Sequence, residues 1–178
     1  MTEPNATRVE AAVSPDMIER RQSQRLLQES EERFRCLVMA AQSGIVLQER
    51  DGRITAWNAT AERVFGISAS QAIGLDETSY NWRTYREDGT PFPGSEHPSI
   101  DTFTTGQPCT GVIMKVMRDT GDFSWININT CPLFRDEETT PYAVVITFSD
   151  ITTRKIAEKR LKKNKEIFSL FLKHSPIY

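Results

Sequence analysis

Hydrophobic and polar positions divide this chain into two charged, helix-like ends and a strand-rich middle. Residues 1–15 carry few apolar side chains and two prolines, so we expect a disordered N-terminus. Residues 16–42 contain no Pro or Gly. Leu27 and Phe34 stand seven residues apart there, with Leu37 one turn further on. This spacing predicts a long amphipathic helix able to form a coiled coil.

Turn signals organise the segment that follows. Gly44 is expected to end the first helix. Two short apolar segments then flank the pair Asp51-Gly52, the strongest hairpin signal in the chain. Asn58 and Ser68 each precede a short helical pattern, and both residue types accept hydrogen bonds from helix N-termini. We therefore predict a β-hairpin followed by two short helices.

The second half of the middle region is rich in strands. Residues 75–94 show no periodicity and are expected to be irregular. Ser95 is expected to start a helix through residue 105, with Pro98 in its first turn. Three strands should follow, at residues 110–118, 123–134 and 142–148. Strands grouped apart from helices predict an α+β fold with a five-stranded antiparallel sheet.

The last predicted strand runs into a charged helix without a loop. Residues 142–148 are largely β-branched or aromatic, whereas 151–173 carry eight basic and two acidic residues. Asp150 or Thr152 can cap this helix by accepting a hydrogen bond from one of its first N–H groups. So direct a connection is rigid, and a movement of the sheet core, residues 43–150, can pass along the helix. This is the layout of a signal-input domain.

Four ordered patterns give the chain a family resemblance. They are the hairpin D-G-R-I-T-A-W-N, the helix N-A-T-A-E-R-V-F-G-I-S, the strand G-D-F-S-W-I-N-I-N-T-C-P-L-F-R-D and the terminal F-S-D-I-T. Over residues 30–153 the chain resembles PAS domains, the sensor modules of bacterial and archaeal signalling proteins. The resemblance implies short helices across one sheet face and long flanking helices. It also implies a downstream output domain, such as a histidine kinase or a diguanylate cyclase, in the same polypeptide.

An internal repeat supports this interpretation. The segment that begins at Leu27 is echoed by the one that begins at Leu161, and Phe34 then matches Phe168. The final H-S-P-I-Y, residues 174–178, resembles the opening of a PAS domain. We therefore interpret these last residues as the truncated start of a second PAS domain.

Composition narrows the class of protein. The net charge is −2, from 22 basic and 24 acidic residues, so no global field favours nucleic acid. Apolar runs such as 44–47 and 143–146 are far too short to span a membrane, and we expect no leader at the start of the chain. We therefore expect a cytoplasmic protein. Cys36 and Cys131 are expected to pack as small hydrophobes and Cys109 to be partly exposed, without disulfides or zinc.

Cofactor chemistry has little support in the residues. His97 could ligate haem, as a histidine from this region does in some PAS domains, but a structural role at the helix start is favoured. Residues 66–105 contain no cysteine, which excludes covalent flavin photochemistry. Side chains are expected to alternate between the two faces of the predicted strand 123–134. Alignment with flavin-binding relatives implies that Ile126, Ile128 and Thr130 are the set that faces a cavity. That set suits a small apolar ligand or, as the favoured alternative, a filled core.

The basic C-terminal helix has two interpretations. Its lysines and arginines, seven of them in residues 154–165, could form a nucleic-acid stripe. However, five seam positions fall at spacings of four and three: Ala157, Leu161, Asn164, Phe168 and Phe171. We therefore expect the basic residues to be the solvated faces of a helix that forms a homodimer, through Leu161 and Phe168 and through Leu27, Phe34 and Leu37.

Two functions follow as predictions. The first is a non-catalytic PAS sensory module that takes up a small-molecule or partner signal and transmits it through dimeric helices, with Asp150 and Thr152 at the junction. The second is a ligand-free PAS module that serves only as a dimerisation or docking spacer. No pairing of a nucleophile with a base, and no phosphate-binding loop, suggests an enzyme.

Overall fold

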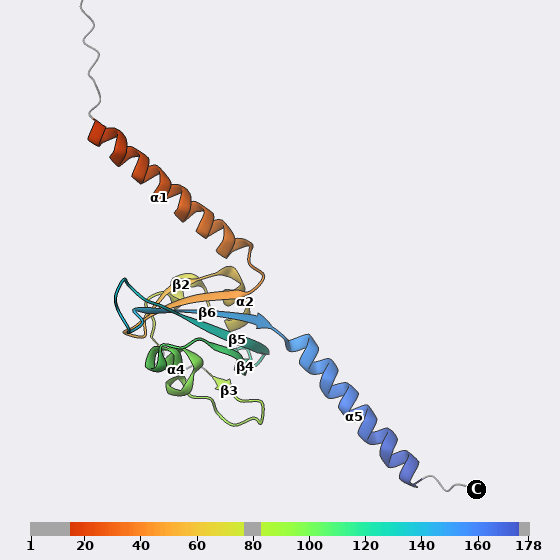
Figure 1. The fold of residues 1–178 in the computed structure, drawn as a ribbon. Helices are drawn as coiled ribbons and strands as arrows, with labels where there is room; N and C mark the ends of the chain where they lie inside the picture. The colour runs from red at the N-terminus through yellow and green to blue at the C-terminus, as the bar shows by residue number, and fades with distance from the viewer. Residues whose placement is uncertain (1–14, 77–82, 175–178) are drawn as a thin grey trace, which may run out of the picture. The chain divides into compact units, whose positions relative to one another are not determined.

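The computed structural model describes residues 15–76 and 83–174 (Figure 1). It contains two units, Met1–Ala40 and Ala41–Tyr178. Helix α1 belongs to the first unit, and every other element belongs to the second. The elements are α1 (Pro15–Ala40), β1 (Gly44–Glu49), β2 (Ile54–Trp57), α2 (Ala59–Phe65), α3 (Ala69–Ala72), β3 (Thr84–Tyr85), the 3-10 helix η1 (Gly94–Glu96), α4 (Pro98–Thr105), β4 (Cys109–Met117), β5 (Phe123–Leu133), β6 (Ala143–Asp150) and α5 (Thr152–His174). The predicted disorder at residues 1–15 and the predicted second-domain start at 174–178 lie outside the described residues, except for Pro15 and His174, which belong to α1 and α5.

The strands form one antiparallel sheet in the order β2-β1-β6-β5-β4-β3. This confirms the α+β class but corrects the predicted count of five strands to six. The additional strand is β3, which pairs Thr84 with Val116 and Tyr85 with Lys115. It lies in the segment expected to be irregular. The sequence did not indicate this strand, because two residues are too few to show any alternation. Its position depends on pairing with β4.

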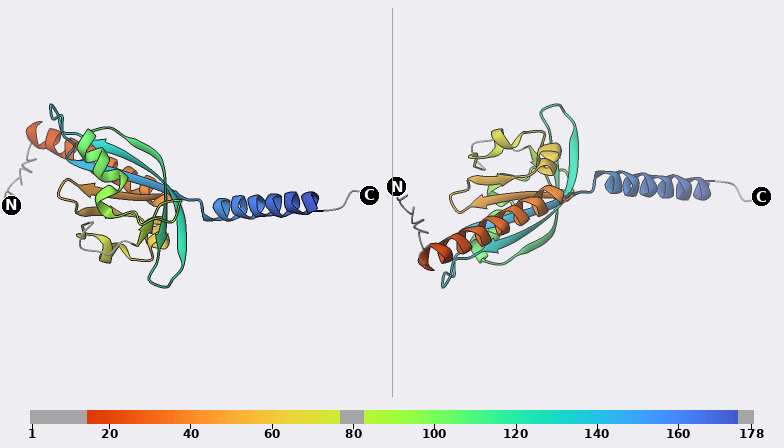
Figure 2. Two further views of the ribbon diagram at one scale, coloured as in Figure 1. Left: turned by 90° about the horizontal axis from the view of Figure 1, so that it is seen from below. Right: turned by 90° about the horizontal axis from the view of Figure 1, so that it is seen from above.

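The helices of the core lie on one face of this sheet. Helix α4 contacts β4, β5 and β6, and α2 contacts β1. The view from below in Figure 2 shows α4, in green, across the strands. Along β5 the even-numbered residues from Ser124 to Thr130 are buried on this face, whereas Asn129 and Cys131 are exposed on the other. The hydrophobic core therefore lies between this face of the sheet and the short helices.

Local capping follows the sequence at Asn58. Its Oδ1 accepts from the backbone N–H groups of Ala61 and Ile45, each at 3.0 Å. This side chain therefore starts α2 and also fixes the entry of β1. The predicted start of the later helix at Ser95 is wrong. Residues 94–96 form a separate 3-10 turn, and α4 begins at Pro98 after His97 in an extended conformation.

Gly44 begins β1 and does not terminate the preceding helix, which ends at Ala40. Gly44 pairs with Phe148 across the β1–β6 ladder. A Cβ atom placed on Gly44 would lie 2.1 Å from Cε2 of the Phe148 ring. Glycine is therefore needed here for space, and its role could not be told from a helix stop without knowledge of the strand pairing.

The predicted environments of two cysteines are wrong. Cys36 and Cys131 are exposed, and Cys109 is of intermediate exposure as expected. Cys36 is on α1, whose described side chains are almost all exposed. Cys131 is on the outward face of β5, so the strand alternation that buries Ile128 necessarily turns Cys131 outward.

Candidate functional site: a small cavity and the strand-to-helix junction

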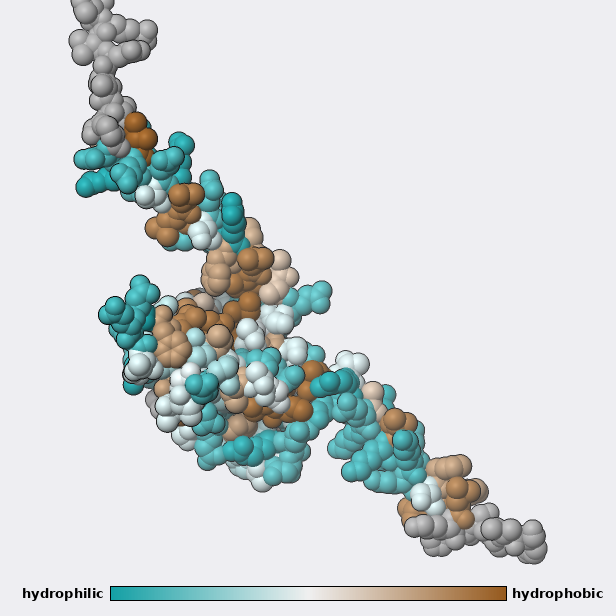
Figure 3. Space-filling model, in the orientation of Figure 1, coloured by the Kyte–Doolittle hydropathy of each residue, from teal (hydrophilic) through white to brown (hydrophobic). Residues whose placement is uncertain are grey.

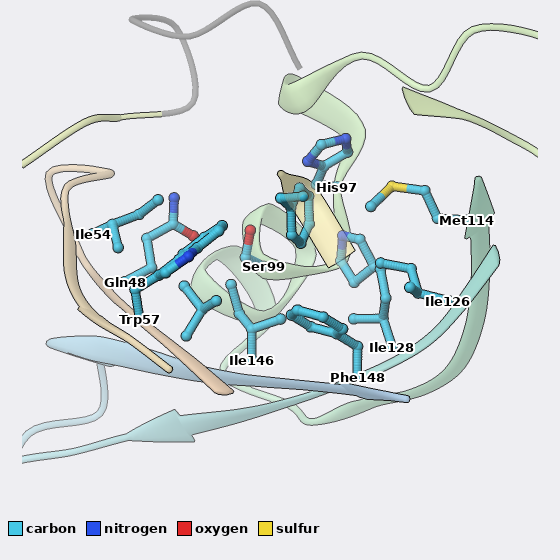
Figure 4. Close-up of a pocket in the computed structure, with 13 residues that line it drawn as sticks. Gln48, Ile54, Trp57, His97, Ser99, Met114, Ile126, Ile128, Ile146 and Phe148 are labelled. Carbon is cyan, nitrogen blue, oxygen red and sulfur yellow. The ribbon is translucent and has the colours of Figure 1, made fainter. Parts of the chain in front are cut away.

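A small cavity lies between the sheet and the first turn of α4 (Figure 4). Its free volume is about 70 Å³. The walls are mainly aliphatic and aromatic, with three polar side chains among them. The lining residues are Val46, Gln48, Ile54, Trp57, Phe65, His97, Pro98, Ser99, Met114, Ile126, Ile128, Ile146 and Phe148.

The size of the cavity limits what it can hold. One water molecule needs roughly 10–15 Å³ of such free volume. A volume of about 70 Å³ therefore corresponds to a few waters or a small organic molecule. Sites for drug-sized ligands are usually about 300–1,000 Å³. A flavin or a haem would require the walls to move apart.

Two of the three residues predicted to face a pocket line this cavity. Ile126 and Ile128 are buried in its wall. Thr130 is buried on the same face but is not one of the lining residues. Its hydroxyl lies 2.6 Å from the hydroxyl of Thr102 on α4 and accepts from the backbone N–H of Cys109 at 3.1 Å. Helix α4 therefore covers Thr130, which acts as a polar contact between helix and sheet.

Sequence reasoning missed the polar part of the wall. Gln48 is 1% exposed and lies on β1 in phase with Gly44 and Val46, which are also buried. Alternation along β1 could have assigned it to the inner face. Ser99 and His97 come from the start of α4, where no periodicity indicates direction. Only the packing of α4 on the sheet brings them to the cavity.

His97 is held by its surroundings. Its Nε2 lies 3.0 Å from the carbonyl oxygen of Phe92 and 3.0 Å from Oγ1 of Thr84. Because a carbonyl oxygen can only accept, Nε2 carries the proton and donates. The ring also stands edge-on to Phe92, with centroids 5.3 Å apart. Ligation of haem iron through Nε2 would break both hydrogen bonds, so the contacts favour the structural role.

The junction between sheet and C-terminal helix has a defined set of hydrogen bonds. Asp150 Oδ1 accepts from the backbone N–H of Thr152 at 2.8 Å. The hydroxyl of Thr152 accepts from the backbone N–H of Trp125 at 2.8 Å, and the N–H of Ile151 donates to the carbonyl of Trp125 at 2.8 Å. Asp150 thus caps α5, whereas Thr152 connects the helix to β5.

A second connection reaches the first turn of α5 from β3. Lys155 forms an ion pair with Glu87, just after that strand. The neighbouring Arg86 forms an ion pair with Glu96, and its guanidinium carbon lies 3.9 Å from the centroid of the Phe92 ring. Phe92 in turn contacts His97 at the cavity. The start of α5 is therefore linked to the cavity region through β5 and also through the β3 segment.

The residues predicted to form a dimer are all exposed. On α1 these are Leu27, Phe34 and Leu37, and on α5 they are Leu161 and Phe168, with exposed fractions of 57–70%. Figure 3 shows brown apolar side chains on the surface of α1 and on the later part of α5. Large apolar side chains left in water are typical of an interaction surface.

Within residues 15–76 and 83–174, every helix is too short or too polar to cross a bilayer.

Comparison with known proteins identifies the fold. A domain from Colwellia psychrerythraea, described as a PAS domain, has a TM-score of 0.51 and 22% identity, and the match covers 72% of this chain and 98% of that one. The PAS domain of Bordetella pertussis BvgS has a TM-score of 0.51 and 20% identity, over 79% and 98% of the two chains. A Burkholderia thailandensis sensory box histidine kinase/response regulator has a TM-score of 0.52 and 20% identity, over 77% and 98%.

No match was found among proteins with curated descriptions. At the level of sequence, the family model described as PAS fold matches residues 32–151. This range confirms the resemblance inferred from the four motifs, while the second-domain start at the C-terminus stays a prediction. The matched range takes in the sheet, the cavity and the first residue after β6. The chain belongs to the PAS family.

Proposed function

We propose that this chain is a cytoplasmic sensory module, non-catalytic in itself, whose cavity receives a small-molecule signal. The signal passes through dimeric helices to an output domain, a histidine kinase or a diguanylate cyclase, elsewhere in the polypeptide. One structural neighbour is described as a sensory box histidine kinase/response regulator, which is consistent with such an output.

The connection made by β5 carries the proposal. Ile126 and Ile128 face the cavity from this strand, and the adjacent Trp125 holds Thr152 and Ile151 through its backbone. A ligand that displaces β5 therefore acts directly on the first residues of α5. Because Asp150 caps the helix, the first turn of α5 stays intact and moves together with β5.

Transmission beyond the junction requires a second copy of the chain. Both long helices present large apolar side chains to water, and burial of such a stripe against a symmetric partner would remove it from solvent. In this proposal α1 and α5 form the dimer, and the basic residues of α5 remain solvated. The helices then report the state of the sheet as a change in coiled-coil geometry.

The small cavity volume also favours the alternative function, a ligand-free spacer that dimerises or docks neighbouring modules. Extraction of the purified protein followed by mass spectrometry separates the two functions. A stoichiometric small molecule supports sensing, and its absence supports the spacer.

A pair of variants makes this test specific to the cavity. Ile146→Phe enlarges a side chain in the cavity wall, whereas Val145→Phe enlarges its neighbour, which faces the other side of the same strand. Sensing predicts that the molecule is lost only from Ile146→Phe. Equal retention in both variants would place the molecule outside the cavity.

A further inference from the structure

The amide of Gln48 is the unusual feature of the cavity wall. The side chain is 1% exposed, and its Nε2 donates to the carbonyl oxygen of Gly52 at 2.9 Å. A carbonyl oxygen only accepts, so this bond fixes the orientation of the amide. Oε1 is thereby left as the free end, and it has no hydrogen-bond partner in the described part of the chain.

An unpartnered buried acceptor is unfavourable and therefore informative. No hydrogen bond offsets the free energy of removing this oxygen from water, and an apolar side chain of similar shape would avoid that cost. In Figure 4 the Gln48 oxygen lies on the side of Trp57 and Ser99, among the lining side chains. The acceptor thus belongs to the cavity and is in position to meet a donor that enters it.

The rest of the wall defines the remaining properties of that molecule. Ten of the thirteen lining residues are aliphatic, aromatic or methionine. None of the lining residues that the structure describes is Asp, Glu, Lys or Arg, so a charged ligand would be desolvated without a counter-charge. A volume of about 70 Å³ admits only a small molecule.

We propose that the cavity binds a small, neutral, mostly apolar molecule that carries one hydrogen-bond donor, and that Gln48 Oε1 accepts from this donor. The inference rests on the proposed sensing function and specifies its ligand class. Gln48 is then the residue that distinguishes a hydroxylated or N–H-bearing molecule from a hydrocarbon of the same shape.

Ethanol and fluoroethane, which are small enough for this volume, test this directly in the unaltered full chain. The two molecules have nearly the same shape, and only ethanol carries a donor. Titration of each, followed by the methyl NMR signals of Ile126 and Ile128, gives two dissociation constants. We expect ethanol to bind about three- to tenfold more tightly, the ratio for one net hydrogen bond. Equal affinity, or no binding of either compound, would overturn the proposal.

Variants then locate the donor's partner. Gln48→Met removes the acceptor with little change of shape and should abolish the preference for ethanol. Gln107→Met makes the same change at an exposed glutamine after α4, and this control variant should retain the preference for the donor-bearing probe. A preference that persists in Gln48→Met would overturn the assignment. The proposed function fails by a different result, the absence of any small molecule on extraction, whereas equal affinity of the two probes overturns only the ligand class proposed here.

Discussion

The hydroxyl of Thr152 offers the sharpest test of how the sheet holds the outgoing helix. It accepts from the backbone N–H of Trp125 at 2.8 Å, between β5 and the first turn of α5. Thr152→Val replaces this hydroxyl by a methyl group of the same shape, so no cavity forms. Both residues are β-branched and similar in helix propensity. The change therefore isolates one hydrogen bond.

The expected magnitude follows from the burial of the donor. An N–H left unsatisfied in a protein interior costs about 1–3 kcal/mol. Trp125 is only partly buried, so water can reach its amide in part and the lower half of that range applies. We expect Thr152→Val to lower the free energy of unfolding by about 1–2 kcal/mol. Thr152→Ser keeps the hydroxyl and should cost less than about 1 kcal/mol.

Denaturant unfolding and amide hydrogen exchange together provide the assay. In Thr152→Val the Trp125 amide should exchange about tenfold faster for each 1.4 kcal/mol lost at the junction. Protection in residues 142–148 should persist, because their ladders with β1 and β5 are untouched. Equal effects of the Val and Ser substitutions would refute the role of the hydroxyl. Loss of protection throughout the sheet would show that Thr152 supports the whole domain.

Three other predictions concern the core, the helices and one turn. Ile128→Ala should lower the unfolding free energy by roughly 2–4 kcal/mol as a core truncation, whereas Asn127→Ala on the other face should cost under about 1 kcal/mol; reversed values in denaturant unfolding would contradict the strand orientation. Joint replacement of Leu27 and Phe34 by Asp should shift the protein toward monomer in ultracentrifugation, and a monomeric unaltered chain at high micromolar concentration would exclude the dimer. The pKa of Asp88 should lie below its ordinary value of 3.8, because the hydroxyl of Thr90 donates to its carboxylate. Any stabilisation of the turn by this carboxylate is then present above pH 3.8 and is lost as the pH falls through the lowered pKa. An NMR titration midpoint at or above 3.8 would contradict this prediction.

Periodicity predicted the elements whose signal is local. The alternation along β5 correctly separated buried Ile126 and Ile128 from exposed Asn129. The side chain of Asn58 identified a helix start because the bond it makes reaches only three residues along the chain. The position of Asp150 before a charged helix indicated its capping role for the same reason. In each case the interacting groups are neighbours in sequence.

Tertiary structure decided everything that depends on partners distant in the chain. Strand β3 exists because Thr84 pairs with Val116, and Gly44 is required because Phe148 lies across it. The hydroxyl of Thr152 could have capped its own helix, but the pairing of β5 with β6 places the Trp125 amide within reach.

The same is true of the cavity. A glutamine in a strand is ordinarily a surface residue, and only the packing of the short helices over the sheet buries Gln48 and leaves its oxygen beside an open volume. Sequence pattern reports which face of an element a side chain occupies. It does not report which other element covers that face, because that is set by contacts between segments far apart in the chain.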